Sequence, residues 1–163
     1  MTGSTTGSTA GSTAGSTAGS MGSAASGGRT IQAKLDSQSE VPQPTVGSST
    51  PSGTVMITVN PDSLNYKITA TGLTSPVTAA HIHLGEAGKA GAVIAPLTIS
   101  TGSDPSSASG EGTIDASAIK GKNADGSPMA MKDLLSALQS GGTYVNVHTQ
   151  NNKPGEIRGQ LTP

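Results

Sequence analysis

Cysteine, phenylalanine and tryptophan are absent from this 163-residue chain, and tyrosine occurs only twice. Without cysteine the chain can form no disulfide, no thiolate metal site and no cysteine nucleophile. A core without Phe and Trp must be built from Val, Ile, Leu, Ala and Met, which bury less area per residue than aromatic side chains. We therefore expect one domain of ordinary stability with an aliphatic core.

Charged residues are also scarce. Lys, Arg, Asp and Glu make up 12% of the chain, and the formal net charge is −1. With neither a basic run nor an aromatic platform, nucleic acid is not an expected partner. No stretch approaches the roughly 20 apolar residues of a membrane span, so no membrane span is expected. The first residues lack the basic and apolar parts of a signal peptide, so we expect any export signal to have been removed or never to have existed.

The N-terminal segment is of low complexity. A Gly-Ser-Thr-Ala tetrad repeats from Gly7 to Ala18. Such a composition cannot bury enough apolar surface to offset the entropy of ordering it, which predicts a flexible linker or a stalk. The expected organisation is a linker over residues 1–28 and a folded domain over residues 29–163.

From residue 29 onward, apolar and polar residues alternate with the period of two that is typical of a β-strand. Turn sequences such as Asn60-Pro61-Asp62-Ser63 separate these segments. Seven or eight short strands joined by turns predict an all-β antiparallel sandwich or barrel. The expected strands cover about residues 29–35, 54–59, 64–70, 77–84, 92–99, 143–149 and 155–161, with 112–116 a short strand at best.

One short helix is expected near residues 128–139. Ser127 can cap it and Pro128 suits its first position. Four apolar residues follow at the spacing of one buried helix face: Met131, Leu134, Leu135 and Leu138. Gly141 and Gly142 are expected to end the helix.

All three histidines lie in two of the expected strands. Because side chains alternate along a strand, His81 and His83 share one face of residues 77–84. By the same count Tyr144, Asn146 and His148 share one face of residues 143–149. If the two strands are neighbours, three imidazoles meet on one polar surface. This surface is the best candidate for a functional site in the sequence.

Two interpretations of this surface stay open. Neutral imidazoles are good ligands for copper, zinc or nickel, so the three histidines are candidate metal ligands. Glu156 is a candidate fourth ligand or outer acceptor, Arg158 would sit beside it, and Asn146 belongs to the same candidate binding face. Alternatively, the same side chains form a hydrogen-bonded network that satisfies itself and fixes strand register without a metal.

Several segments resemble the CHRD domain, the module first described in chordin. They are the two histidine segments, the motif Glu40-Val41-Pro42 and the closing run Pro154-Gly155-Glu156-Ile157-Arg158-Gly159-Gln160-Leu161. The resemblance extends from about Thr30 to Leu161. It implies an immunoglobulin-like β-sandwich with Greek-key connections, located outside the cell, at the cell surface or in the periplasm. It implies no general enzymatic activity.

The His81-Ile82-His83 strand also resembles the copper strand of copper–zinc superoxide dismutases, whose fold is a similar β-sandwich. Three histidines and no cysteine are too few for that family's paired metal sites and disulfide. The chain also lacks a Gly-x-Ser-x-Gly elbow and a phosphate-binding loop, so we expect no enzyme.

Three functions remain open. The first is a secreted or surface-displayed binding module for a protein or cell-surface ligand. The second is an extracellular or periplasmic protein that binds copper or zinc. The third is a structural subunit that self-assembles through its N-terminal tail or an exposed edge strand.

Overall fold

The computed structural model describes residues 28–163, so the predicted linker lies almost entirely outside the described residues. Strands account for most of the regular structure, which confirms the predicted all-β class. The elements in chain order are β1 (Arg29–Asp36), β2 (Ser52–Val59), β3 (Leu64–Thr71), β4 (Val77–Leu84), β5 (Val93–Leu97), β6 (Ser100–Thr101), β7 (Ala108–Ile114), the 3-10 turn η1 (Ala116–Ala118), α1 (Met131–Gln139), β8 (Thr143–Thr149) and β9 (Ile157–Leu161).

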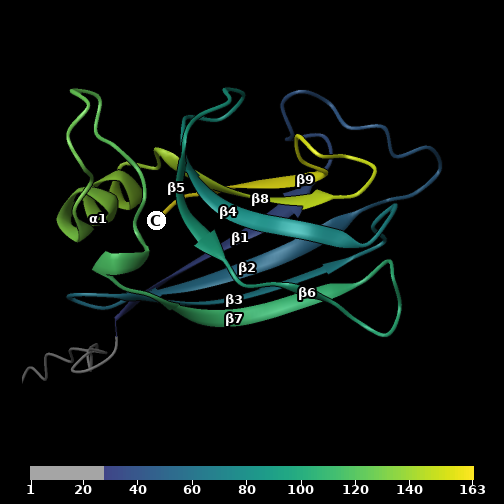
Figure 1. The fold of residues 1–163 in the computed structure, drawn as a ribbon, viewed down its shortest axis with the longest axis horizontal. Coiled ribbons are helices and arrows are strands. Elements are labelled where there is room, and N and C mark those ends of the chain that lie inside the picture. The colour runs from purple at the N-terminus through teal and green to yellow at the C-terminus, as the bar shows by residue number, and fades with distance from the viewer. Residues whose placement is uncertain (1–27) are drawn as a thin grey trace, which may run out of the picture.

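The strands form one antiparallel sheet in the order β5-β4-β8-β9-β1-β2-β3-β7-β6, curled into a half-barrel. The sheet folds over at the junction of β9 and β1, which share only the register pair Asp36 and Arg158. In Figure 1, β4, β8 and β9 consequently form an upper layer above β1, β2, β3 and β7. This arrangement matches the predicted antiparallel sandwich.

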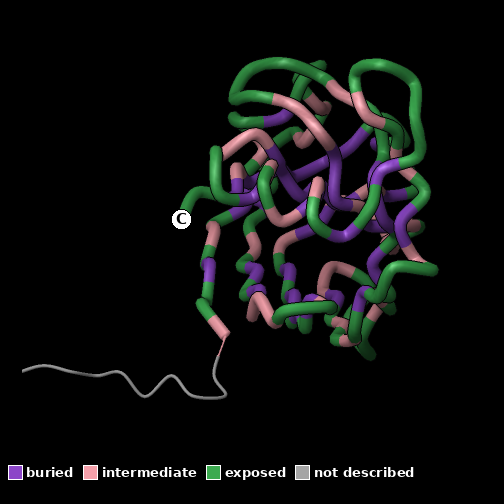
Figure 2. The backbone as a smooth tube through the Cα atoms, turned by 90° about the vertical axis from the view of Figure 1, so that its left-hand side faces the viewer, coloured by how far each residue is buried: buried purple, intermediate pink, exposed green. Residues whose placement is uncertain are grey.

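The core lies between these two layers, where each strand turns its apolar side chains inward. Along β3, buried and exposed residues alternate without interruption. On the opposite layer, Ile82 of β4 and both Val145 and Val147 of β8 are fully buried. Figure 2 shows the buried stretches gathered inside the half-barrel. Because alternate residues face opposite ways, the histidines of β4 and β8 necessarily project from the outer surface of the upper layer.

The helix begins later than predicted. Its N-cap is Ala130 rather than Ser127, and Asp133 accepts the Ala130 N–H at 2.9 Å. Ser127 instead donates its hydroxyl to Asp125 at 2.6 Å. Pro128 is held in extended backbone by an isolated β-bridge to residue 122, so the helix cannot start there. The buried face is confirmed at Met131, Leu134 and Leu138. Within residues 28–163, no helix is long and apolar enough to cross a membrane.

The strand expected over residues 112–116 is longer and starts earlier. β7 spans seven residues and pairs with β3 along its whole length. Two glycines in β7 weaken the sequence pattern but fit the packing. A Cβ on Gly112 would lie 2.7 Å from the Tyr66 hydroxyl, and one on Gly110 would lie 1.9 Å from the Thr98 carbonyl oxygen. Close approach of neighbouring groups therefore explains why these two strand positions are glycine.

Candidate functional site

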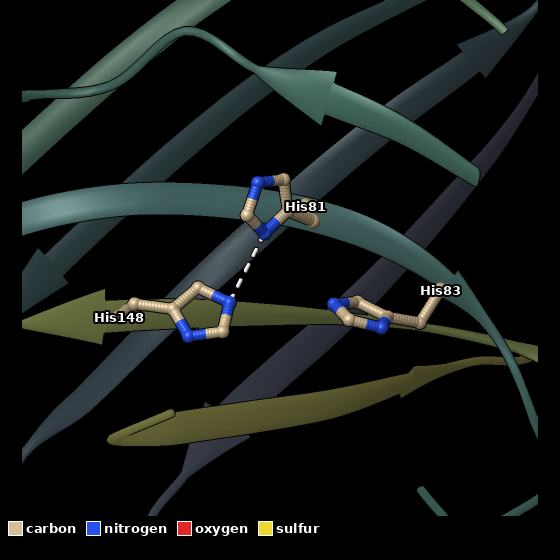
Figure 3. Close-up of side chains that lie close together, drawn as sticks. All are labelled: His81, His83 and His148. Carbon is tan, nitrogen blue, oxygen red and sulfur yellow. Dashed lines mark hydrogen bonds between the residues drawn. The ribbon is translucent and has the colours of Figure 1, made fainter. Parts of the chain in front are cut away.

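The structure brings the three histidines together on the outer surface of the upper layer. β4 and β8 are antiparallel neighbours, with His81 opposite Asn146 and His83 opposite Tyr144. His148 lies further along β8, and the three rings converge (Figure 3). One ligand nitrogen from each ring lies within 4.8 Å of the other two. The predicted meeting of the two histidine strands is therefore present.

Main-chain carbonyls orient two of the rings. His83 Nδ1 lies 2.9 Å from the carbonyl oxygen of Gly91, and His148 Nδ1 lies 2.8 Å from that of Lys153. A carbonyl oxygen can only accept a hydrogen bond, so both Nδ1 atoms carry the hydrogen. The Nε2 atom of each ring is therefore left with its lone pair. A histidine bound to a metal commonly has this arrangement, with its second nitrogen donating to a carbonyl.

The third ring completes the group. His81 Nδ1 lies 3.0 Å from His148 Nε2 (Figure 3). Since His148 Nε2 can only accept, His81 is the donor in this pair. The Nε2 atom of His83 is buried and has no hydrogen-bond partner among the described residues. The lone pair of His148 Nε2 thus accepts a hydrogen bond, whereas that of His83 Nε2 is buried and unused.

The electrostatic setting keeps the imidazoles neutral. Burial, together with the nearby rings of His148 and His83, lowers the pKa of His81 to about 4. Burial also lowers the pKa of His83 and of His148, although the carbonyls of Gly91 and Lys153 oppose the shift. All three rings are therefore in the neutral form near pH 7. This is the form that binds a metal ion.

Tyr144 stacks against His83, and Arg158 packs on Tyr144 in turn. The rings of His83 and Tyr144 are stacked, with centroids 4.8 Å apart and planes inclined by 11°. The Arg158 guanidinium carbon lies 3.4 Å from the Tyr144 ring centroid. The Tyr144 hydroxyl accepts the N–H of Gly91 at 3.0 Å, and Gly91 is the residue whose carbonyl orients His83. Sequence reasoning put Tyr144 on this face but gave it no role.

Glu156 does not join the histidines. It is fully buried, and its oxygens accept hydrogen bonds from Thr74, Thr149 and Asn152. No hydrogen bond or ion pair links it to a histidine or to Arg158 among the described residues. The structure therefore assigns Glu156 to a different cluster, which holds the β3–β4 connection against the β8–β9 turn.

Arg158 instead lies beside Glu40, a residue for which the sequence offered only the family motif as a signal. Arg158 Nη2 donates to the Glu86 carbonyl oxygen at 2.8 Å, while Nη1 has no partner. Glu40 Oε2 and Asn146 Oδ1 are also buried without a hydrogen-bond partner among the described residues. Several buried polar atoms around the histidines therefore lack a hydrogen-bond partner, whereas a purely structural network would pair them all.

A comparison with known protein families bears out the resemblance seen in the sequence. The family model described as CHRD domain matches residues 31–161. No curated protein and no solved structure matches the chain. The match covers both histidine strands, Glu40 and the closing segment with Glu156 and Arg158.

Proposed function

The chain belongs to the CHRD domain family, and from this premise we propose that it is a β-sandwich binding module that holds a transition-metal ion. The ligands are His81, His83 and His148. One observation carries the proposal: the carbonyls of Gly91 and Lys153 fix the hydrogen on Nδ1 of His83 and His148, so that Nε2 of each ring keeps its lone pair. The lone pair of His148 accepts from His81, and that of His83 is unused. A hydrogen-bonded network has no need of an unused, buried lone pair at His83.

The spacing of the nitrogens suits a metal after a small adjustment. Bonds of about 2.0–2.1 Å to a tetrahedral ion require nitrogens about 3.3 Å apart. His81 Nδ1 and His148 Nε2 are already 3.0 Å apart, and the ligand nitrogens of the three rings all lie within 4.8 Å of one another. The ion takes the position of the hydrogen that His81 shares with His148, and His81 shifts its proton to Nε2. A modest rotation of the His83 ring then brings its Nε2 atom to bonding distance from the ion.

Copper(II) is the preferred ion, with zinc(II) second. Imidazole nitrogen binds both, and affinity for divalent ions of this series is greatest at copper. The three histidines supply no thiolate, so the site is not suited to hold copper(I) by soft ligands. Three protein ligands also leave a position for water or for a group of a partner molecule.

We also propose a non-catalytic role outside the cytoplasm, at the cell surface or in the periplasm. The family resemblance supports the location. The hydrogen bonds of Glu156 support the absence of catalysis, because a carboxylate held by Thr74, Thr149 and Asn152 is not available to transfer protons at the histidines. The binding partner, whether a protein or another cell-surface ligand, would reach the open position of the metal.

Self-assembly through an edge strand is disfavoured at the β5 edge of the sheet. β5 carries Pro96, which cannot donate to a further strand, and its pairing with β4 is interrupted by a register shift. β6 at the other edge has only two residues and pairs only with Ala108 and Ser109, so residues 110–114 of β7 form the rest of that edge. Short or interrupted edges are a common protection against strand addition.

The test is a titration of metal-free protein, prepared without a histidine tag, with copper(II) and zinc(II). We expect one ion per chain and a higher melting temperature, because an ion that binds only the native state stabilises it by about 4 kcal/mol at a thousandfold excess over Kd. The variant His81→Ala with His148→Ala should lose both effects. Glu86→Gln, which removes an exposed carboxylate, is the matched control and should keep them. Unchanged affinity in the double histidine variant would overturn the proposal.

A further inference from the structure

A cavity of about 390 Å³ lies between the β1–β2 connection and the β4–β5 loop. None of the three histidines lines it, although Arg158 in its lining packs on Tyr144, the ring that stacks on His83. Its lining includes Ser39, Glu40, Gln43, Ala87, Gly88 and Arg158. The volume is at the lower end of the range for small-molecule pockets.

The floor of this cavity contains an arginine whose charge is not paired. Arg158 is only 1% exposed. Its Nη2 atom donates to Glu86 O at 2.8 Å and approaches Gln160 Oε1 at 3.4 Å, but both hydrogens of Nη1 lack an acceptor within residues 28–163. The one ion pair in that range joins Lys89 to Glu86 at the surface. A buried cation without an anionic partner is costly, so Arg158 is poised for an anion.

Glu40 provides the second unpaired group. It is 1% exposed, and its Oε1 accepts the N–H of Val41 at 3.0 Å while Oε2 has no partner in the described part of the chain. Burial raises the pKa of Glu40, although the Val41 hydrogen bond, the charge of Arg158 and the Asn146 side chain oppose the shift. Glu40 forms no ion pair with Arg158 among the described residues. It offers a carboxyl group to a hydroxyl instead.

We propose that this cavity binds a small carboxylic acid that also carries hydroxyl groups, such as a sugar acid. Its carboxylate accepts from Nη1 of Arg158, and one hydroxyl bonds to Glu40. The fork of an arginine favours a carboxylate over a neutral group, because hydrogen bonds between charged partners are about twice as strong. The hydroxyl and amide side chains of Ser39 and Gln43 at the rim suit further hydroxyls of the same ligand.

The test uses D-glucuronate as the probe and D-glucose as the uncharged control. Binding is measured by nuclear magnetic resonance of the isotope-labelled full chain without metal. We expect glucuronate to bind with a Kd of about 1 mM or tighter. The shifts should concentrate in residues 38–43, 87–88 and 158–160. Glucose should bind at least tenfold more weakly. Equal binding of glucose, or no shifts in these three segments, would overturn the assignment of a carboxylate site.

Three variants locate the binding. Ala87→Trp, at an exposed position of the lining, should block the cavity and weaken glucuronate binding at least tenfold. Arg158→Met should do the same if circular dichroism shows that it folds, and Ala87→Trp decides the matter if it does not. The variant His81→Ala with His148→Ala should bind glucuronate as the wild type does. Loss of binding in that double variant, or retention in Ala87→Trp, would contradict the proposal independently of any result with metal.

Discussion

Two buried glutamates, Glu156 and Glu40, have opposite environments although neither exposes more than 1% of its surface. Burial raises the pKa of Glu156, but hydrogen bonds from Thr149, Thr74 and Asn152 together outweigh it, so the net shift is downward. Burial also dominates at Glu40, where the Val41 backbone hydrogen bond, the charge of Arg158 and the Asn146 side chain do not overcome it, so its pKa is raised. Glu156 is thus held as an anion, whereas Glu40 is pushed toward its neutral form.

The same difference separates two polar regions of the molecule. Around Glu156 the buried side chains are bonded to one another, and the cluster joins distant loops. Around His83, Asn146 and Arg158, buried atoms are left without partners in the described chain. Since leaving a buried polar group unpaired costs free energy, the first region is structural and the second is where ligands are expected.

The sharpest test of this comparison is the same conservative change at both glutamates. Glu156→Gln should lower the free energy of unfolding by about 3 kcal/mol, because it removes the charge that accepts several hydrogen bonds and turns an amide N–H₂ toward donors. Glu40→Gln should change it by less than about 1 kcal/mol, since burial already disfavours its charge. Urea unfolding of both variants and the wild type measures the difference. Equal losses at the two positions would remove the distinction.

A second test asks whether a histidine in the unsatisfied region contributes to ligand binding rather than to folding. In His83→Phe the ring stack on Tyr144 is retained, while Nε2 and the bond to Gly91 are lost. The metal-free variant should unfold within about 1 kcal/mol of the wild type. Added copper(II) should no longer stabilise it. A large loss of stability without metal would instead make His83 a structural residue like Glu156.

The sequence predicted which residues share a face, because strand alternation is a local property. The spacing of His81 and His83, and of Tyr144 and His148, was sufficient once the two strands proved to be neighbours. The late start of the helix was not predictable from Ser127 and Pro128. It depends on a β-bridge at Pro128 and on the carboxylate of Asp133, which accepts the backbone N–H of Ala130.

The partners of charged side chains were the least predictable feature. Glu156 and Arg158 are two residues apart and were expected to pair. Two of their actual partners, Thr74 for Glu156 and the Glu86 carbonyl for Arg158, come from loops more than 70 residues earlier in the chain. Such contacts depend on how loops close over the sheet, and strand periodicity carries no information about that closure.

The smallest expected effect is a pH dependence that belongs to the histidine region. The pKa of His81 in the folded protein is about 4, below its ordinary value of 6.5, so between these values the unfolded chain binds more protons. Stability is therefore fully present above pH 6.5 and is lost as the pH falls toward 4. Because His81 is only partly buried, solvent screening limits the loss to about 1 kcal/mol or less.

The two buried glutamates also titrate with shifted pKa values, so a variant is needed to isolate the contribution of His81. The lowered pKa of Glu156 makes its contribution disappear below pH 4.5, whereas the raised pKa of Glu40 makes stability fall as the pH rises through its titration. Urea unfolding of metal-free wild type and of His81→Ala, compared at about pH 7 and about pH 5, separates the histidine from both. The wild type should lose more stability than the variant on acidification. Identical losses would mean that His81 is as well solvated in the folded protein as in the unfolded chain, and the unsatisfied region would then lack its low-dielectric character.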